Sequence, residues 1–564
     1  MDPNDGVALR SYFESLKGTL SGDRSTWDGH WKQLAAFFAP RSTRWVASDV
    51  NQGQRKDYDI INETGLLALR TLAAGMLTGM ASQTRPWFRL QSDNPELNKL
   101  QDVRGWFQEV ENKLREVFLK SNTYQSLLTL FGEEGLYGTS AFLIMEDDRT
   151  VIRCQPYPIG SFYLMQDDTL RIDGAIRTVS MTVRQIVERF GYENCSAAIQ
   201  VQYDSASGGV KETNFNIVHV ITKGSYFDPK SYEPPMPWVS VWYEEGSFNP
   251  KKGILRRSGF LENPLICGRW KVTGENIYAE SPAMDCLGSV MSLQCWEERT
   301  AEATEKQFKP TLVASSDLDM RKFTTLPGDI MWADTKDVRG LVEQAYKVDF
   351  RIDGALAQIQ RIEARINDAM YRSLFQMFSD SDRTDVTAAE INAKLQEKMQ
   401  VLGPVVERNV EEVLAPTVKR TLSIMQRKGM LPTMPDALKG QVFKLEFISI
   451  LAQAQRLGGI NSLGGFMGFV GSQVAIVPDI LDNVDTDASV REYAELSGLK
   501  AEILRTPEDV DAIRQGRQQA QAAQQASIAA DNAQKLAGAA RNLSEAHVGT
   551  GSLLDQALPS LVGR

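Results

Sequence analysis

Residues 281–308, SPAMDCLGSVMSLQCWEERTAEATEKQF, read as one uninterrupted helix. Ser281 is a favourable N-cap, and Pro282 suits the first helical turn. The first half carries apolar side chains at helical spacing: Met284, Leu287, Met291 and Cys295. The second half is mostly charged, and a helix of about 26 residues is ~39 Å long. Its polar half therefore cannot be buried in its own core, and we expect it to be solvent-exposed or to pack beside copies of itself.

A second long helix is predicted over residues 350–378, FRIDGALAQIQRIEARINDAMYRSLFQMF. Charged residues occupy one face, and the other face is apolar. The apolar positions are Ile352, Leu356, Ile359, Ile362, Ile366 and Met370. A small mixed module at 309–349 separates the two helices, so the pattern predicts a helical stalk that carries a compact head.

The part before the stalk predicts helices first and strands afterwards. Helical patterns cover residues 7–20, 26–40, 62–81, 102–122 and 123–138. The second of them is expected to open at Ser25 or Thr26. From about Gly138, short runs rich in β-branched and aromatic residues alternate with turn signals, which is typical of strands. Two acidic pairs, Asp147-Asp148 and Asp167-Asp168, sit between such runs; we interpret them as turn residues, with metal ligation as the alternative.

The stretch AAGMLTGMASQTRPWFRL, residues 73–90, combines a Gly-x-x-x-Gly pattern with an aromatic and basic end. A membrane span is excluded, because the apolar run from Leu66 to Ala81 is interrupted by Arg70 and ends near 16 residues, whereas a span needs about 20. We expect Gly75 and Gly79 to permit close helix packing and Pro86-Trp87-Phe88 to plug the junction to the next element. A contact with a partner is the alternative.

After the stalk, the polar residues 379–386 predict a break. The sequence TAAE at 387–390 is a capping box that opens a very long helix, with Gly429 as its C-cap. We expect this helix to kink or break at Gly403-Pro404 and at Pro416. The Gln/Ala-rich segment that follows has high helix propensity but few apolar anchors, and the tail from about Ser544 is expected to be disordered.

The composition and the missing motifs argue against enzymatic activity and against metal or cofactor sites. The 564-residue chain has a net charge of −10, whereas proteins that grip phosphates are usually basic. Its five cysteines and three histidines are scattered, which predicts neither a disulfide framework nor a zinc site. Phosphate-binding, zinc-protease and serine-hydrolase motifs are missing from the sequence. We therefore expect no enzymatic activity, no metal and no cofactor.

Several stretches together resemble the portal, or head-to-tail connector, proteins of short-tailed (podovirus-type) bacteriophages. In chain order they are WKQLAAFFAPRS (31–42), LAAGMLTGMASQTRPWFRL (72–90), YAESPAMDCLGSVMSLQ (278–294), KPTLVA (309–314), LPGDIMW (326–332), DRTDVTAAEI (382–391), QRKGMLPTMPDAL (426–438) and FISILAQAQR (447–456). Their order over about residues 30 to 510 carries the resemblance.

The resemblance implies an α+β, mainly α chain with the portal fold, assembled into a ring with a central channel. It places a wing at 1–281 and 387–440, the two helices of a stem at 282–308 and 351–378, and a clip at 309–350. A tunnel loop would lie at 379–386, a crown at 441–510, and a barrel-like helix with a disordered tail at 511–564. Such rings are usually dodecamers, and twelve copies would carry a charge of about −120.

An acidic bore repels phosphates, so a duplex could slide through it without adhering. We therefore expect the stem acids to face the channel or a neighbouring stem: Glu297, Glu298, Glu302 and Glu305. The tunnel-loop candidates are Ser379, Asp380, Ser381, Asp382, Arg383 and Asp385. Arg383 would contact a phosphate briefly or form an intersubunit salt bridge. The clip docking candidates are Lys309, Arg321, Lys322, Asp334 and Lys336.

The resemblance also implies partners and a location. The expected partners are further copies of the chain, the terminase large subunit, head-tail adaptor and tail proteins, the major capsid and scaffolding proteins, and double-stranded viral DNA. The expected site is the unique portal vertex of the virion, after synthesis in the host cytoplasm. The alternatives are another ring component, such as an adaptor or collar, and a DNA-processing enzyme such as a nuclease or packaging ATPase.

Overall fold

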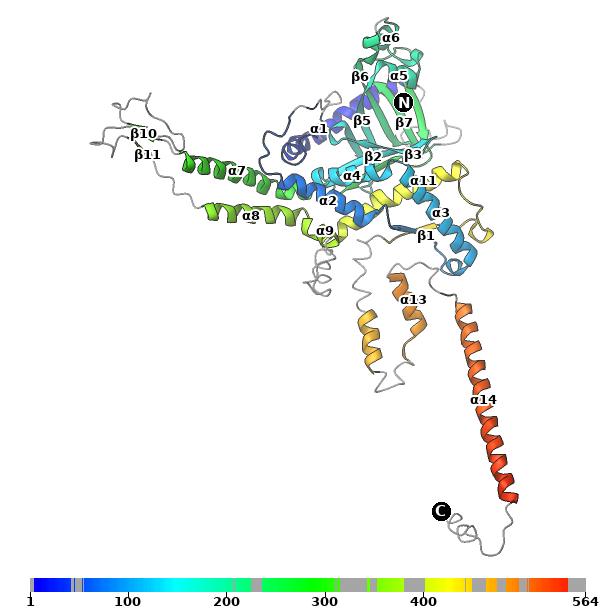
Figure 1. The fold of residues 1–564 in the computed structure, drawn as a ribbon. Helices are drawn as coiled ribbons and strands as arrows, with labels where there is room; N and C mark the ends of the chain where they lie inside the picture. The colour runs from blue at the N-terminus through cyan, green and yellow to red at the C-terminus, as the bar shows by residue number, and fades with distance from the viewer. Residues whose placement is uncertain are drawn as a thin grey trace, which may run out of the picture. The chain divides into compact units, whose positions relative to one another are not determined.

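The structure, a computed structural model of the 564-residue chain, divides into two units, residues 1–458 and 459–564. It describes residues 5–41, 45, 53, 55–205, 208–224, 236–309, 312–314, 342–344, 352–379, 401–441, 443–448, 463–473, 483–496, 505 and 507–545. Within these residues, the first unit combines long helices with small antiparallel sheets (Figure 1). The predicted α+β, mainly α class is therefore confirmed.

Two sheets form the strand-rich region that the sequence predicts from Gly138. The larger sheet has the order β4-β5-β6-β7-β8. Its strands are β4 Phe162–Gln166, β5 Ile172–Thr182, β6 Asn214–Lys223, β7 Trp238–Glu244 and β8 Arg256–Phe260. The smaller sheet has the order β3-β2-β9, with β2 Thr139–Asp147, β3 Val151–Tyr157 and β9 Leu265–Arg269. All of these neighbouring strands are antiparallel.

The acidic pairs between strands are turn residues, as expected. The carboxylate of Asp147 accepts hydrogen bonds from the backbone N–H groups of Arg149 and Thr150 at 3.1 and 2.7 Å. Asp167 accepts in the same way from the backbone of Thr169 and Arg171, both at 2.9 Å. These hydrogen bonds lower the pKa of Asp167 to about 2, and the bond from the Thr169 hydroxyl has the largest effect. Both carboxylates thus stabilise the turn that they open.

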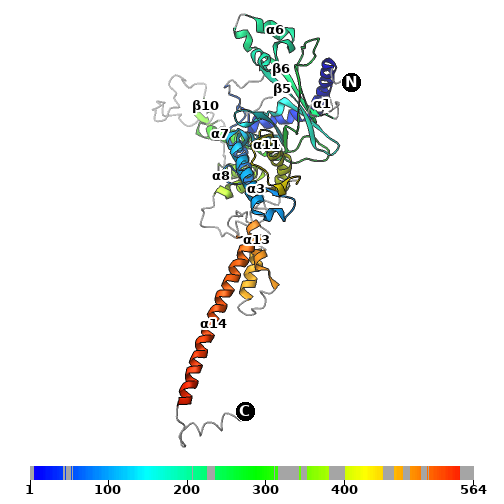
Figure 2. The ribbon, with the colours of Figure 1, turned by 90° about the vertical axis from the view of Figure 1, so that its right-hand side faces the viewer.

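The first helix, α1 (Gly6–Phe38), is continuous, so the prediction of two helices that part near Ser25 is wrong. Its N-terminal half packs through Leu9 and Phe13 on one face of the five-stranded sheet (Figure 2). Its C-terminal half enters the main core. Arg24 explains the continuity, because this buried side chain donates to the carbonyl oxygens of Ile159 and Phe162 and holds the helix where the break was expected.

Two small helices cover part of the opposite face of the five-stranded sheet. They are α5 (Val183–Phe190) and α6 (Ala197–Asp204). Ile186, Phe190 and Ile199 pack with Ile217 and Trp242 of the sheet. These helices were not predicted from the sequence, because each spans only eight residues.

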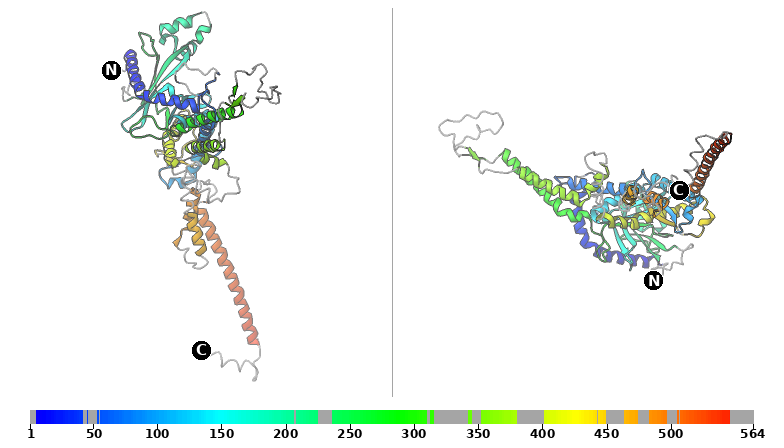
Figure 3. Two further views of the ribbon diagram at one scale, coloured as in Figure 1. Left: turned by 90° about the vertical axis from the view of Figure 1, so that its left-hand side faces the viewer. Right: turned by 90° about the horizontal axis from the view of Figure 1, so that it is seen from below.

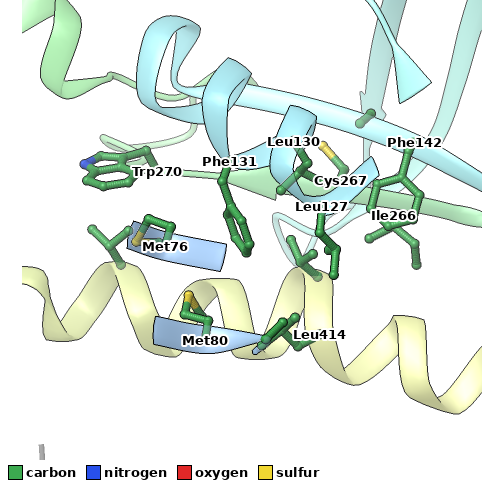
Figure 4. Packing of buried hydrophobic residues seen from close by; sticks show 14 of the residues in the cluster. Met76, Met80, Leu127, Leu130, Phe131, Phe142, Ile266, Cys267, Trp270 and Leu414 are labelled. Carbon is green, nitrogen blue, oxygen red and sulfur yellow. The ribbon is translucent and has the colours of Figure 1, made fainter. Parts of the chain in front are cut away.

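Close helix packing explains the glycines of the segment 73–90. Helix α2 (Thr64–Met80) packs against α4 (Thr123–Tyr137) in the core shown in Figure 4. A Cβ atom on Gly75 would lie only 2.2 Å from the ring of Phe375, and a Cβ on Gly135 would lie 2.6 Å from Leu72. Gly79 is also buried. The predicted role of Gly75 in close packing is confirmed.

Trp87 fills the junction that follows α2. It is buried just before β1 (Phe88–Ser92), which pairs with the distant strand β12 (Phe443–Phe447). The indole stacks on Phe118 of α3 (Gln101–Lys120) with ring centroids 5.8 Å apart, and its N–H donates to the Tyr124 hydroxyl at 3.3 Å. The predicted plug is confirmed, and it joins parts of the chain more than 300 residues apart in sequence.

The long helix that ends near Gly429 is described from residue 401. It is helical through Gly403-Pro404, so the helix does not break there. The irregularity is a π-helical turn at Val410–Leu414, directly before α11 (Ala415–Arg427). Pro416 lacks an N–H donor and crowds the carbonyl four residues earlier, which a widened turn accommodates. Gly429 takes a φ of 66° after the helix and is the expected C-terminal glycine.

The second unit contains a helix at 463–473, α13 (Thr486–Leu496) and α14 (Pro507–Glu545). Arg514 of α14 pairs with Asp487 of α13 at 2.6 Å. Residues 511–538 of α14 are all exposed in the single chain, as the shortage of apolar anchors predicts. The expected disordered tail lies, except for its first two residues, outside the described residues. Among the helices described, none is long and apolar enough to cross a membrane.

Candidate functional site

The first long helix is present as α7 (Pro282–Phe308). The hydroxyl of Ser281 accepts from the backbone N–H of Met284 at 3.1 Å, as an N-cap does, and it also donates to the carbonyl of Leu136 at 2.7 Å. The buried face differs from the predicted stripe, because Met291 is 39% exposed and Cys295 is only partly buried. The buried residues are Pro282, Ala283, Cys286, Leu287, Val290, Leu293 and Gln294.

The second long helix is broken, which corrects the prediction of one helix to residue 378. Helix α8 (Ile352–Ala369) is followed by α9 (Arg372–Ser379), with Tyr371 between them in a left-handed conformation, φ 55°. The break turns Leu374 and Phe375 into the core, where the Phe375 ring lies against Gly75. Burial of these two side chains offsets the backbone strain at Tyr371.

Helices α7 and α8 lie side by side (Figure 3), and one asparagine bridges them. The side-chain amide of Asn62 donates to Glu297 of α7 at 2.9 Å and to Glu363 of α8 at 3.1 Å. Gln294 fixes this segment, because its amide oxygen accepts from the backbone N–H groups of Ile61 and Asn62 at 2.7 and 2.8 Å. A short segment before α2 therefore fastens the two long helices together.

The predicted stem acids fall into two groups. Glu297 is partly buried and accepts the hydrogen bond from Asn62. Glu298, Glu302 and Glu305 are exposed on the outer half of α7. No residue of α7 after Gln294 is buried in the single chain. Among the described residues, the outer half of the helix therefore presents exposed carboxylates and lacks a cover of its own.

Large apolar side chains share this uncovered region. The exposed ones on the two helices are Met291, Trp296, Phe308, Ile352 and Leu356. Phe308, at the end of α7, is 82% exposed, and Leu356 of α8 is 47% exposed. An open groove of about 530 Å³ runs along the outer half of α7 and is lined by Glu297, Thr300, Ala301, Thr304, Glu305, Phe308 and Lys309. Apolar surface of this kind, rimmed by charges, is typical of an interaction surface.

The clip and loop candidates are mostly outside the described residues. Lys309 is exposed directly after α7. Beyond it, strands β10 (Leu312–Ala314) and β11 (Val342–Gln344) pair antiparallel. Ser379 is the last residue of α9. The candidates that lie outside the described residues are Arg321, Lys322, Asp334, Lys336, Asp380, Ser381, Asp382, Arg383 and Asp385, and the capping box at 387–390 lies there too.

A buried polar pair adjoins the π-helical turn. The side-chain amide of Asn409 donates to Oε1 of Glu134 at 2.7 Å, and both residues are fully buried. Burial first, and then the nearby Glu412, raise the pKa of the Glu134 carboxyl to about 8, although the Asn409 hydrogen bond and Arg408 oppose the rise. Glu134 is therefore protonated at neutral pH, which fits the unpartnered position of its Oε2 among the described residues.

Sequence reasoning missed the residues that hold the long helices in place. Asn62 and Glu363 are 301 positions apart, so no local pattern links them. Gln294 did carry a signal, because it is a lone amide next to Leu293 on an otherwise apolar face. The described residues contain no cluster of three or more metal-ligating side chains, and all five cysteines are free.

The chain is similar in sequence to known bacteriophage proteins. The model of the family described as "Bacteriophage head to tail connecting protein" matches residues 10–504. The chain is 37% identical over 538 residues to the portal protein of Salmonella phage epsilon15, a match that covers 95% of each chain. It is 34% identical over 532 residues to the probable portal protein of Bordetella phage BPP-1, covering 93% of this chain and 95% of the relative.

Proposed function

Because the chain belongs to the family of bacteriophage head to tail connecting proteins, we propose that it is a portal protein. It forms the ring at the unique capsid vertex through which double-stranded DNA is packaged and ejected. The same ring is the docking platform for the packaging terminase and then for the tail. The protein acts as a structural channel and not as an enzyme.

The observation that carries this proposal is the incomplete cover of α7 and α8. A single chain leaves Trp296, Phe308 and Leu356 exposed on helices that do have a buried face, which on α7 ends at Gln294. In a ring built by head-to-tail contacts, every subunit presents one such surface to each neighbour, and the ring closes when the rotation closes. We assign α7 and α8 as the stem, the insert after Lys309 as the clip and the segment after Ser379 as the tunnel loop.

The charge of the stem supports passage of DNA. Glu298, Glu302 and Glu305 are exposed and have no ion-pair partner among the described residues, so an assembled ring concentrates negative charge on its stem. Such a surface gives a duplex no counterion-releasing contact and hence no position at which to adhere. Arg383 is the residue we assign to a brief phosphate contact or to a salt bridge between subunits.

The remaining partners follow from the place of a portal in the virion. The clip end, with Lys309, Arg321, Lys322, Asp334 and Lys336, docks the terminase large subunit and later the adaptor and tail proteins. The wing meets the major capsid and scaffolding proteins. The ring is a dodecamer that assembles in the host cytoplasm and becomes part of the capsid.

Electron microscopy of the purified full-length chain tests the proposal. We expect closed rings with a central hole and no nucleotide hydrolysis. Leu356→Glu should abolish rings while leaving the circular dichroism and thermal unfolding of the subunit nearly unchanged, because Leu356 is exposed in the single chain. Leu119→Glu is the matched control, since Leu119 is an exposed leucine of α3. A chain that stays monomeric under all conditions, or robust nucleotide turnover, would exclude a portal.

A further inference from the structure

A recess on the five-stranded sheet has no role in the function above. One face of the sheet is covered by α1, and the other is covered at one end by α5 and α6 and at the other end by the three-stranded sheet. Between these two covers lies a pocket of about 450 Å³. It is lined by Gln155, Arg177, Val179, Ser180, Met181, Gln185, Glu188, Arg189 and Trp242.

Cross-strand register places a basic and aromatic row at the floor of this pocket. Arg177 of β5 pairs with His219 of β6, and His219 pairs with Trp242 of β7, so the three side chains share one face. The rings of His219 and Trp242 stack with centroids 3.7 Å apart. The guanidinium group of Arg189, from α5, lies 4.3 Å from the Trp242 centroid. Two arginines therefore meet in one recess.

Neither arginine has an acidic partner in the part of the chain that the structure describes. Arg177 is only 4% exposed. It donates to the amide oxygen of Gln155 at 2.9 Å and lies over the ring of Tyr157. Its Nε has no hydrogen-bond partner among the described residues. No described carboxylate forms an ion pair with Arg177 or Arg189. Burial lowers the pKa of both groups, and the proximity of Arg177 lowers that of Arg189 further. Burial, with both arginines, also holds the pKa of His219 well below its usual value, so His219 is neutral.

A buried guanidinium group without a charged partner, such as that of Arg177, is costly unless an anion completes it. The planar fork of arginine matches a carboxylate, which can accept two parallel hydrogen bonds. Glu188 also lines the pocket, so the recess has one net positive charge and suits a monoanion. Since a water molecule takes about 30 Å³ of liquid volume, the pocket also has room for the chain that carries the anion, and Val179 and Met181 supply apolar walls.

We propose that the recess between β5, β7 and α5 docks an acidic peptide segment of a partner protein, with an Asp or Glu carboxylate seated between Arg177 and Arg189. A DNA duplex fits this site poorly, because its phosphates lie on a rigid convex surface that cannot insert one group to the buried Arg177. The inference rests on the pocket alone and does not require the portal function.

Binding of a fluorescein-labelled hexaglutamate peptide to the purified full-length chain, measured by fluorescence anisotropy, tests the proposal. Arg189→Gln should weaken binding about tenfold or more, the loss typical of one charge-assisted hydrogen bond. Arg177→Gln should weaken binding by a similar factor, and thermal unfolding checks that this variant still folds. Arg189 is exposed, so Arg189→Gln tests the site even if Arg177→Gln prevents folding. Arg184→Gln is the matched control, because Arg184 is also on α5 but pairs with Glu212 outside the pocket.

Hexaglutamine should not bind, and duplex DNA should not displace the acidic peptide. The proposal is overturned if hexaglutamate does not bind, if Arg184→Gln weakens binding as much as Arg189→Gln, or if inorganic phosphate or duplex DNA binds at this site and the peptide does not. None of these results affects whether the chain forms rings, so failure here is distinct from failure of the portal assignment.

Discussion

The ring of Phe375 lies in the space that a side chain at position 75 would need. A Cβ atom on Gly75 would be 2.2 Å from Cγ and Cδ1 of Phe375 and 2.8 Å from its Cβ. This contact joins α2 to α9, the last described helix before residues 380–386. The glycine therefore fixes where the chain leaves the stem and enters the segment that we assign as the tunnel loop.

Gly75→Ala should destabilise the protein by roughly 1–3 kcal/mol, because overpacking a core has this cost and outweighs the gain of about 1 kcal/mol in helix propensity. Thermal unfolding of the full-length chain measures it. Gly105→Ala is the control, since nothing lies within 4 Å of a Cβ there, and it should be neutral or stabilising. In a Phe375→Ala background, Gly75→Ala should not lower the free energy of unfolding further. An equal loss in both backgrounds would show that the two residues do not interact.

Asn62→Asp should loosen the pair of long helices. The new carboxylate would face Glu297 and Glu363, which now accept from the Asn62 amide at 2.9 and 3.1 Å. We expect a loss of roughly 2–4 kcal/mol, larger than the loss of about 1 kcal/mol for Asn62→Ala, because repulsion is added to a missing hydrogen bond. Denaturant titration measures both.

The control for Asn62 is Asn112→Asp on the exposed side of α3, where the side chain accepts from Arg115. This change should alter stability by no more than about 0.5 kcal/mol. If Asn62→Asp is as mild as the control, the hydrogen bonds of Asn62 do not hold α7 and α8 together.

These two contacts also show how far sequence reasoning reaches. The helix from Pro282, its cap at Ser281 and the strand that opens at Thr139 were predictable, because capping and periodicity are local signals. The break at Tyr371 was not, because the side chains that stabilise it pack against Gly75, about 300 positions away. Periodicity likewise predicted an apolar face on α7. It could not show which of the apolar side chains the subunit buries and which it leaves exposed.

In the candidate site, too, local features were predictable from the sequence and long-range contacts were not. The two long helices and the acids on the outer half of α7 were found from their pattern, because charge and spacing are visible in a short window. Asn62 and Arg177 were missed, since an asparagine before a helix and an arginine within a strand are common in any chain. Only the fold shows that Asn62 joins two helices and that Arg177 is buried without a described carboxylate beside it.

Glu134→Gln should change the pH dependence of stability. The pKa of Glu134 is about 8 in the folded protein, against 4.5 for a free glutamate, so between about pH 5 and pH 8 the folded state holds a proton that the unfolded state lacks. The free energy of unfolding therefore decreases as the pH rises through this window. Glutamine keeps the acceptor for Asn409 and removes the titration. The variant should equal the wild type near pH 5 and exceed it by roughly 1–3 kcal/mol at pH 8.5.

Thermal unfolding at the two pH values measures this difference. Glu109→Gln on the surface of α3 is the control and should leave the pH dependence unchanged. Some pH dependence will remain in Glu134→Gln, because burial also raises the pKa of Glu133 to about 8 and that of Glu111 to about 7. An identical pH profile for Glu134→Gln and the wild type would show that Glu134 is ionised in the folded protein.

Charge reversal on the outer half of α7 tests whether these acids face the DNA path. The triple variant Glu298→Lys, Glu302→Lys and Glu305→Lys changes each subunit from −10 to −4, because each replacement adds two charges. The control makes the same change in net charge on α3 with Asp102→Lys, Glu109→Lys and Glu116→Lys, all exposed.

Binding of purified rings to duplex DNA is measured over a range of salt concentrations. Stem lysines should tighten binding about tenfold or more and steepen its salt dependence, since each phosphate contact releases counterions, and packaging in infected cells should slow. The α3 control should bind DNA much as the wild type does. Equal effects of both variants would mean that net charge alone matters and that the stem acids do not line the channel.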